Sequence, residues 1–410
     1  MVWRETCAVE ERMRLVMAIV ENQDSMATVC RRFGVSRKTG YKWLERYERD
    51  GAAALVDRSR APLTHPHALT ERIASRLIEV RRAHPTWGPV KVRAYLERRA
   101  PRTRWPAAST IGDLFDREGL TVKRRLRRRS PPSSAPFGHC GAANDVWCID
   151  FKGWFVTGDG TVCEPLTLSD AHSRYLLRCQ AVPTTDTDQV WPILEAAFRE
   201  FGLPRRLRSD NGPPFASTGV GGLSRFAVKV IKAGVVPERI VPGKPQQNGR
   251  LERLHLTLLR DTAEPPAQTL RQQIERLRRF QKLYNEERPH AALDNDTPAE
   301  HYTISPRRFD GVLREPVYGS DHAVRRVRHN GEIRWQGRTV YVSAALTGEP
   351  VGLLENEGGS FTASYGPVVL GVIAQGDSRL RKPKPAACGH VDNAARCPHA
   401  QEPQQQPQNG

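Results

Sequence analysis

Apolar residues recur at helical spacing in the N-terminal part of the chain. A first helix over about residues 9–21 is predicted by Met13, Val16, Met17 and Val20. Gly34 then provides a turn and Ser36 an N-cap for the next helix, which is typical of two helices joined by a tight connection. Gly40 lies inside that next helix, where it costs about 1 kcal/mol relative to Ala. The pattern predicts a helix-turn-helix domain over residues 1–60.

Three shorter amphipathic segments follow and predict a second helical module over residues 68–122. Thr70 can cap the first of its helices, Pro89 can open the second and Ser109 can open the third. This order is typical of a further helix-turn-helix or a winged helix. A run of cations and a Pro/Ser-rich stretch come next, so we expect residues 123–140 to form a basic linker.

The middle of the chain alternates between short apolar runs and amphipathic helical segments. The run Val146–Ile149 is β-branched and aromatic, which favours a buried strand, and apolar segments between residues 161 and 183 favour two more. A helix from about Asp186 to Phe201 places apolar residues on one face. A short run before Asp210 favours a further strand. The order predicts an α/β domain with a mixed or parallel sheet over residues 141–305.

A helix around Leu270–Tyr284 ends the helical patterns, and short strand patterns dominate the rest of the chain. Asn330-Gly331 is a strong hairpin turn, which we expect to join residues 324–328 to residues 333–335. Further strands complete a small all-β barrel over residues 310–376, for which one role is that of a purely structural cap. Residues 377–410 are rich in Pro and Gln and predict a disordered tail.

Charge and cysteine usage narrow the class of protein. The chain of 410 residues has a formal net charge of +18, which favours an anionic polymer as partner, with RNA or ribosome binding open on charge alone. No run approaches 18 apolar residues and acidic residues interrupt any signal-peptide pattern, so we expect a cytoplasmic protein. The cysteines show no disulfide framework. Four residues of the tail are weak candidates for zinc: Cys388, His390, Cys397 and His399.

Basic or polar residues in three places are candidate DNA contacts. On the predicted recognition helix these are Arg37, Lys38, Thr39 and Lys42. In the linker they are Lys123, Arg124, Arg125, Arg127, Arg128 and Arg129, a run suited to sequence-independent phosphate binding. Near the end of the α/β domain they are Lys244, Arg250 and Arg253. A solvated basic face is the alternative for each group, because exposed cations are often only hydrated.

Three acids have local sequences suited to a shared metal site. Asp150 ends a buried strand, Asp210 follows a strand at the turn Ser209–Phe215, and Glu252 begins a helix after a loop rich in Pro, Gly and Asn. In open α/β sheets, ligands gather at the carboxyl ends of strands, where two of these acids belong. Carboxylates are preferred by Mg²⁺ and Mn²⁺, and a pair of such ions can stabilise both oxygens of a phosphodiester displacement.

The motifs around these acids resemble a known family. Trp147-x-x-Asp150, Ser209-Asp210-Asn211-Gly212 and the run from Pro245 to Glu252 are similar to the catalytic core of bacterial insertion-sequence transposases and retroviral-type integrases, the DDE family. The segments Tyr284–Leu293 and Thr297–Glu300 match the usual ending of that core. The Asp210–Glu252 spacing is longer than the retroviral one, and the Gly-rich stretch 217–222 can account for the excess. The retroviral His-His-Cys-Cys zinc domain is absent, so the resemblance is closer to the bacterial enzymes.

The resemblance implies an RNase H-like catalytic core in which Asp150, Asp210 and Glu252 hold two Mg²⁺ or Mn²⁺ ions. It further implies cleavage at the 3′ ends of an insertion element and strand transfer of the new 3′-hydroxyl into target DNA. The partners are then double-stranded DNA, as terminal inverted repeats and target, and further copies of the chain in a homo-oligomer. His255, one turn beyond Glu252, is a possible substrate contact. Two alternatives stay open: a non-catalytic DNA-binding regulator, and a nuclease without joining activity.

Overall fold

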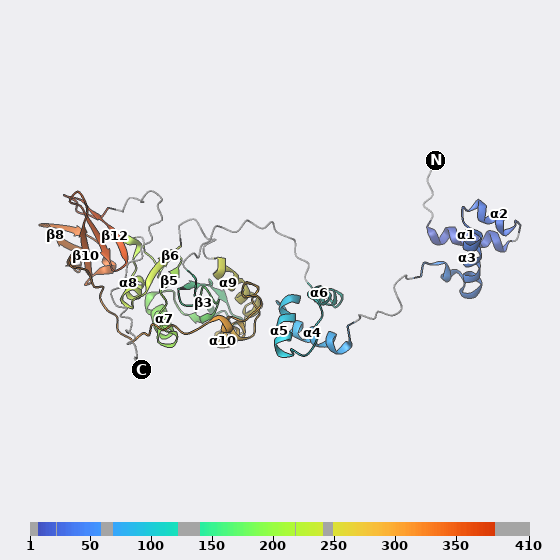
Figure 1. Cartoon of the computed structure of the whole chain (residues 1–410), viewed down its shortest axis with the longest axis horizontal. Helices are drawn as coiled ribbons and strands as arrows, with labels where there is room; N and C mark the ends of the chain where they lie inside the picture. The colour runs from blue at the N-terminus through green and yellow to red at the C-terminus, as the bar shows by residue number, and fades with distance from the viewer. Residues whose placement is uncertain are drawn as a thin grey trace, which may run out of the picture. The chain divides into compact units, whose positions relative to one another are not determined.

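The computed structural model describes residues 7–21, 23–58, 69–121, 140–217, 219–240 and 249–381 (Figure 1). The chain divides into two compact units, residues 1–69 and residues 70–410, and each is described by itself. The basic run at 123–129, Lys244 and the Cys/His pairs of the tail lie outside the described residues. None of the helices in the described ranges is long and apolar enough to span a bilayer.

The first unit is the expected three-helix domain. Its helices are α1 (Ala8–Val20), α2 (Met26–Arg32) and α3 (Arg37–Asp50), and a 3₁₀ turn follows at Ala52–Leu55. Ser25 and Ser36 cap α2 and α3 by accepting hydrogen bonds from main-chain N–H groups three residues on. The core consists of Leu15, Val16, Val29, Trp43 and Leu55.

Gly40 is explained by the packing of α2 against α3. A Cβ atom at this position would lie 2.5 Å from Cys30 Sγ and 3.1 Å from Met26 Sδ, so only glycine allows the two helices to approach this closely. The loss of helix propensity is therefore offset by contact between the helices.

The second unit begins with a helical module of α4 (Glu71–Ala83), α5 (Pro89–Arg99) and α6 (Ala108–Arg117). Pro89 is the first residue of α5, as its missing N–H favours. The expectation that Ser109 opens the third helix is wrong, because α6 begins one residue earlier, after Ala107. Within residues 69–121 the structure contains no strand, so this range has no wing.

The central domain is a mixed sheet with helices on both faces. Its strands are β1 (Val146–Phe151), β2 (Phe155–Val156), β3 (Val162–Asp170), β4 (Leu176–Val182), β5 (Arg206–Ser209) and β6 (Val236–Arg239). Their order is β2-β3-β1-β5-β6, with β4 paired to β3. β1 runs antiparallel to β3 and parallel to β5, which confirms a mixed sheet.

The two faces of β1 belong to different cores. Trp147 and Ile149 pack with α7 (Thr187–Phe201) and α8 (Arg225–Lys232). Val146 and Cys148 pack with α9 (Gly249–Thr262) and α10 (Leu270–Glu286). This alternation follows from the two-residue period of a strand and accounts for the continuous apolar run in the sequence. Asp186 caps α7 as expected.

The C-terminal strands do not form the single closed barrel expected from the sequence. They are β7 (His322–Arg326), β8 (Glu332–Trp335), β9 (Arg338–Tyr341), β10 (Pro350–Glu355), β11 (Phe361–Tyr365) and β12 (Val368–Ile373). The pairing gives a four-stranded sheet, β12-β11-β10-β7, and a separate β8-β9 ladder. Residues 378–381 continue the pairing beyond the expected domain end, with Arg381 bridged to Val372.

The expected hairpin across Asn330-Gly331 is also wrong in its pairing. The turn is present, since Gly331 N donates to Arg328 O at 2.9 Å, but β7 pairs with β10 and β8 pairs with β9. The hairpin therefore turns at Gln336-Gly337, where both residues have positive φ.

The C-terminal strands pack on the central domain. Leu223, Ala227 and Ile231 of the α8 region share one apolar core with strand residues such as Val351 and Tyr365. At its edge Lys232 Nζ lies 2.7 Å from Glu349, which also accepts a hydrogen bond from the Tyr365 hydroxyl. The Gly-rich stretch expected to be only an inserted loop lies against β12, since a Cβ on Gly221 would approach Leu370 to 3.0 Å.

Candidate active site and nucleic-acid interface

Asp150 and Asp210 are at equivalent register positions near the carboxyl ends of two neighbouring parallel strands. The register pairs Cys148 of β1 with Arg208 of β5, and each aspartate lies two residues further along its chain. Neighbouring strands are about 4.8 Å apart, and residues of equal parity share a face. Asp150 is therefore on the face of Cys148, which packs with α9 and α10. Asp210 is on that face as well, where the strand direction continues.

Short-range contacts fix the turn that carries Asp210. Its Oδ1 accepts a hydrogen bond from Gly212 N at 3.1 Å, and Ser209 O accepts one from Ile240 N. Phe151 and Phe215 stack with their ring centroids 5.3 Å apart, so the end of β1 is tied to the turn after β5. These contacts explain why the sequence Asp-Asn-Gly-Pro-Pro-Phe follows the strand.

Glu252 lies in the first turn of α9 and is exposed. Leu251 and Leu254 on either side of it are buried against the sheet. His255, one turn later, is only 9% exposed, and its Nε2 lies 2.8 Å from the Thr167 hydroxyl. Residues i and i+3 are neighbours on a helix surface, so Glu252 is at the edge of the face that contacts β3.

Thr167 joins the helix of Glu252 to the strand of Asp150. It is directly opposite Asp150 in the β1–β3 register, and its hydroxyl donates to Asp150 O at 3.1 Å. A hydroxyl has one proton, so His255 Nε2 is the donor in the second bond. Burial, with Lys152 nearby, lowers the pKa of His255 to about 4, so the ring is neutral. His255, expected as a possible substrate contact, is instead a buried tie between α9 and the sheet.

The structure does not bring the three carboxylates into a metal cluster; Asp150 and Asp210 come from neighbouring strands, and Glu252 comes from α9, the helix that covers the face of Cys148. Within the described ranges no group of three or more His, Cys, Asp or Glu side chains is placed to hold an ion. The donor set itself is made only of carboxylate oxygens, which fits a hard cation such as Mg²⁺ or Mn²⁺. The residues present therefore suit such an ion by their chemistry.

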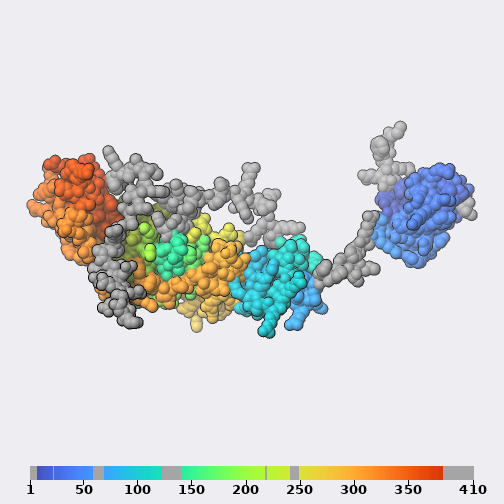
Figure 2. Space-filling view, in the orientation of Figure 1, coloured from blue at the N-terminus to red at the C-terminus, as the bar shows by residue number. Residues whose placement is uncertain are grey.

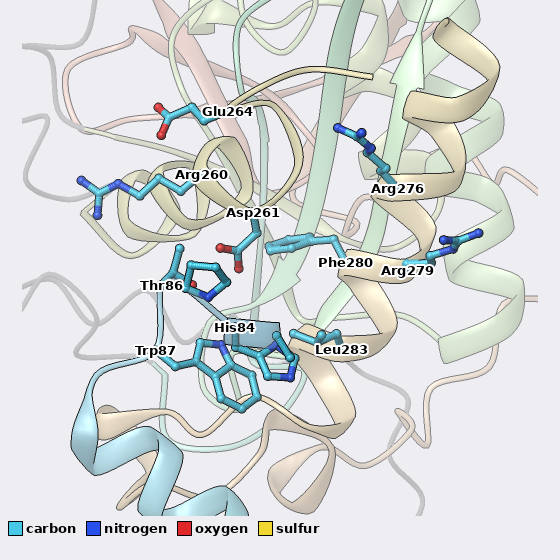
Figure 3. Close-up of a pocket in the computed structure, with 12 residues that line it drawn as sticks. His84, Thr86, Trp87, Arg260, Asp261, Glu264, Arg276, Arg279, Phe280 and Leu283 are labelled. Atoms are coloured by element: carbon cyan, nitrogen blue, oxygen red, sulfur yellow. The ribbon is translucent and has the colours of Figure 1, made fainter. Parts of the chain in front are cut away.

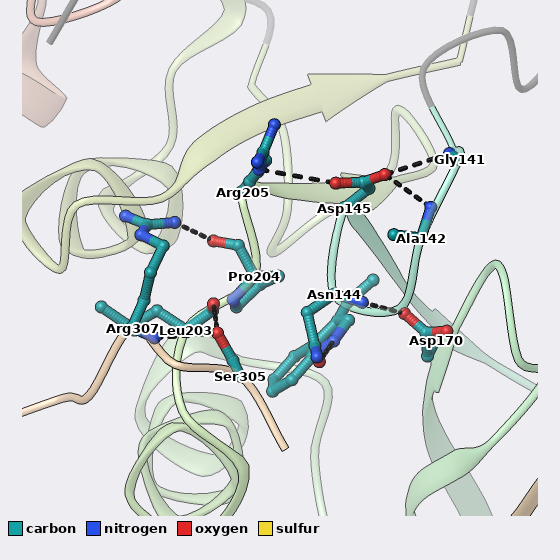
Figure 4. A network of polar contacts seen from close by, with 11 residues as sticks. Gly141, Ala142, Asn144, Asp145, Asp170, Leu203, Pro204, Arg205, Ser305 and Arg307 are labelled. Atoms are coloured by element: carbon teal, nitrogen blue, oxygen red, sulfur yellow. Dashed lines mark hydrogen bonds and ion pairs between the residues drawn. The ribbon is translucent and has the colours of Figure 1, made fainter. Parts of the chain in front are cut away.

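Other acids of the domain have structural roles. Asp145 accepts hydrogen bonds from Gly141 N and Ala142 N at the start of β1 (Figure 4). Asp170 is 1% exposed and accepts from Asn144 N and from Ser173, and burial raises its pKa above the ordinary value. Asn144 Nδ2 also donates to Thr303 O, so the same hydrogen-bond network attaches the segment near residue 305 to the start of β1.

The recognition helix α3 exposes most of the residues expected to face DNA. Arg37, Lys38 and Lys42 are exposed, whereas the Thr39 hydroxyl lies 3.0 Å from Ser36 Oγ and belongs to the cap. Tyr41 is 57% exposed on the same helix and was not singled out by the sequence. The flat ring of Tyr41, beside two cations, suits contact with a nucleic acid. Only the exposure of the ring indicates this role.

Arg250 and Arg253 have different surroundings on α9. Arg250 Nη1 donates to Ala171 O at 2.5 Å, which ties α9 to the end of β3. Arg253 lines a pocket of about 600 Å³ together with Arg260 of the same helix and with cations from other segments. The sequence did not predict four of these cations as DNA contacts, Lys91, Arg174, Arg260 and Arg288, because they converge only in the fold.

The helical module contacts the central domain beside this pocket (Figure 2). Arg99 Nη2 lies 2.8 Å from Glu287, and Tyr95 donates to the same carboxylate. A second pocket of about 450 Å³ shares Thr86 and Arg260 with the first and is lined by Trp87, Asp261 and Phe280 among others (Figure 3).

The motif that ends the family-like core has a structural role. Asn285 accepts from Leu176 N and donates to Leu176 O, which fixes α10 on β4. Arg288 is 7% exposed and lies 3.1 Å from Asp261 of α9. Thr297 and Glu300 form a capping box at α11 (Pro298–His301).

Comparisons with known families match both halves of the chain. Residues 141–245 and 233–298 match models described as integrase core domain. Residues 11–62 match a helix-turn-helix domain and residues 39–115 a homeodomain-like domain.

Two relatives are insertion-element proteins. The insertion element IS407 uncharacterized 31.7 kDa protein of Burkholderia multivorans is 29% identical over 255 residues, which are 61% of this chain and 88% of the relative. The insertion element IS476 uncharacterized 39.2 kDa protein of Xanthomonas euvesicatoria is 25% identical over 264 residues, 61% of this chain and 70% of the relative.

Among solved structures, the HTLV-2 integrase catalytic core domain in complex with magnesium aligns with 40% of this chain and 99% of its own, at 14% identity and a TM-score of 0.31. The matches to the domain models and to the two relatives support the resemblance found in the sequence: the chain combines regions similar to helix-turn-helix domains with regions similar to an integrase core domain, and both relatives are insertion-element proteins.

Proposed function

We propose that this protein is a metal-dependent transposase that cleaves the 3′ ends of an insertion element and joins them to target DNA. The observation that supports the proposal is the register of β1 and β5, in which Cys148 pairs with Arg208 two residues before Asp150 and Asp210. Glu252 is in the first turn of α9, the helix that covers the face of Cys148. In the proposal these three acids come together at one site when metal and DNA bind.

Asp150, Asp210 and Glu252 are the residues that hold divalent ions in this proposal, two ions in each site. When bound, such ions supply Lewis acidity at a scissile phosphate and stabilise the attacking and leaving oxygens. In the first reaction water breaks the phosphodiester and leaves a 3′-hydroxyl. In the second, that hydroxyl attacks a phosphodiester of the target strand. A new P–O bond joins the element end to the target phosphate, and the bond between that phosphate and the target's own 3′ oxygen breaks. The displaced target end therefore leaves with a 3′-hydroxyl.

Other residues of the chain orient these carboxylates and hold the substrate. The His255–Thr167–Asp150 hydrogen bonds keep α9 in register with β1, so Glu252 keeps its position relative to the strand ends. Arg37, Lys38 and Lys42 of α3 read the terminal repeats of the element in the major groove. Because two ends must be processed together, the working form is a homo-oligomer on double-stranded DNA.

The test uses purified full-length protein, Mg²⁺ and labelled DNA that carries the element's own terminal repeats. Both 3′-end cleavage and strand-transfer products are expected, and Asp150→Asn and Glu252→Gln are expected to abolish both. Asp188→Asn is the matched control, since this exposed acid lies in the first turn of α7, which packs on the other face of the sheet. Cleavage without joining would make the protein a nuclease, and DNA binding with no cleavage would make it a regulator.

A further inference from the structure

A strongly cationic pocket lies between the helical module and the central domain. It has a volume of about 600 Å³ and is lined by six cations and no carboxylate. The cations are Lys91, Arg174, Arg250, Arg253, Arg260 and Arg288. They come from α5, the β3–β4 turn, α9 and the turn after α10, so only the folded unit assembles them.

Four of these cations have no counter-charge of their own. Within the described ranges the side chains of Lys91, Arg174, Arg253 and Arg260 make no hydrogen bond or ion pair, whereas Arg288 is paired with Asp261. Arg174 Nε is also shielded from solvent without an acceptor. A buried donor without a partner costs roughly 1–3 kcal/mol, so binding of an anion that accepts from Arg174 Nε would be favoured here.

The pKa of Lys91 also reflects burial in this pocket without a counter-charge of its own. Burial, and next the charge of Arg288, lower the pKa of Lys91 to about 7, with Arg253 acting in the same direction and Asp261 opposing it. His290 on the same wall is neutral, because burial lowers its pKa to about 3, so it adds no charge. A phosphate in the pocket would restore the proton on Lys91 and provide acceptors for the arginines.

The shape of the cationic surface fits a polymer better than a single small anion. Arg250, Arg253, Thr257 and Arg260 form one stripe along α9, at spacings of three and four residues. From Arg250 to Arg260 the stripe is about 15 Å long at the rise of an α-helix, which spans several phosphates of one DNA strand. Arg253 is in the same helical turn of α9 as Glu252, so the stripe begins in the turn that carries the third candidate carboxylate.

We propose that this pocket binds consecutive backbone phosphates of duplex DNA, through Lys91 of α5 together with Arg174, Arg253 and Arg260 of the central domain. The proposal rests on the proposed function, because it assigns the DNA path next to the carboxylates. It adds that the helical module and the central domain hold the same strand, without reading its sequence.

The test measures binding of the full-length protein to a labelled duplex of scrambled sequence, without divalent ions, over a series of salt concentrations. Each phosphate contact contributes about 0.9 to the slope of log K against log salt. Lys91→Met and Arg253→Gln are each expected to lower that slope by about 0.9 and to weaken binding roughly fivefold near physiological salt. Arg253→Lys keeps the charge and is expected to keep the slope.

The matched control is Arg93→Gln, which removes one positive charge from α5 at a residue that is already paired with Glu97. It is expected to leave the slope unchanged, and melting curves check that each variant is folded. Unchanged slopes in both Lys91→Met and Arg253→Gln would overturn the proposal. The proposal would also be overturned, in favour of a small-anion site, if inorganic phosphate and DNA raised the melting temperature of the protein equally at matched phosphate concentration.

The outcome is independent of catalysis. If the pocket variants lose slope while the wild-type protein cuts no DNA, the pocket is supported and the proposed function fails. If Asp150→Asn abolishes cleavage while the pocket variants bind like the wild type, the function stands and the pocket proposal fails.

Discussion

Helices α3 and α9 both present a line of cations, but their settings differ. The cations of α3 are exposed on a small three-helix domain, and the helix packs through Trp43 and its close contact at Gly40. Those of α9 line a pocket, and the same helix is fixed to the sheet by Leu251, Leu254 and His255. An exposed recognition helix suits reading of a groove, whereas a helix locked to the sheet suits holding a backbone beside the chemistry.

The largest expected effect distinguishes DNA cleavage from DNA binding at the candidate carboxylates. Asp210→Asn is expected to lower the single-turnover rate of 3′-end cleavage by on the order of a thousandfold, because a carboxylate that holds an ion loses its charge. The affinity for element DNA should stay within about twofold in the absence of divalent ions. A variant that retains cleavage would remove Asp210 from the site.

Disrupting the α3 side alone tests whether sequence reading depends on that domain. Gly40→Ala is expected to destabilise the first unit by about 1–3 kcal/mol, because the new Cβ meets Cys30 Sγ at 2.5 Å. The measurement is the melting of that unit, followed by selectivity for terminal repeats over scrambled DNA. Cys30→Ala in the same chain should recover part of the loss, and a lack of recovery would contradict the packing explanation.

His255 tests whether α9 must be held in register with β1. His255→Ala is expected to lower the cleavage rate about tenfold while DNA affinity is retained, since the bond to Thr167 is lost and Glu252 is no longer fixed. His255→Gln can still donate to Thr167 and should recover much of the rate at unchanged KM. A loss of DNA binding in proportion to the rate would show a merely structural effect.

The smallest effect concerns Lys91 and the dependence of stability on pH. The folded-state pKa of Lys91, about 7, is below its unfolded value, so the folded state binds fewer protons between about pH 7 and 10.5. This group therefore destabilises the fold below pH 7, and that penalty disappears as the pH rises through this range. Lys91→Met should be more stable than the wild type at pH 6 in denaturant unfolding. The difference should narrow at pH 9, and a constant difference would contradict the shift.

Features encoded in neighbouring residues could be predicted from the sequence. The helix-turn-helix follows from the caps Ser25 and Ser36, and the mixed sheet follows from apolar runs with a turn after each. The common face of Asp150 and Asp210 follows from strand parity once the two strands are paired. These features depend on short-range chemistry, which the sequence displays directly.

Features that depend on long-range choice could not be predicted. The Asn330-Gly331 turn forms, yet β7 prefers β10 as its partner, because pairing and burial decide which strands join. The cationic pocket combines Lys91 with Arg174 and Arg288, which are far apart along the chain and converge only in the fold. The buried role of His255 depends on Thr167, which lies on a strand whose register the sequence does not reveal.

The shared apolar core between α8 and the C-terminal strands has a consequence for shortened copies of this protein. Removing everything after residue 310 would leave Leu223, Ala227 and Ile231 facing water and Lys232 without Glu349. Water-exposed apolar patches of this kind promote aggregation. A truncated copy would therefore be an unstable fragment that the cell degrades, and not a smaller enzyme or a competing repressor made from the catalytic domain.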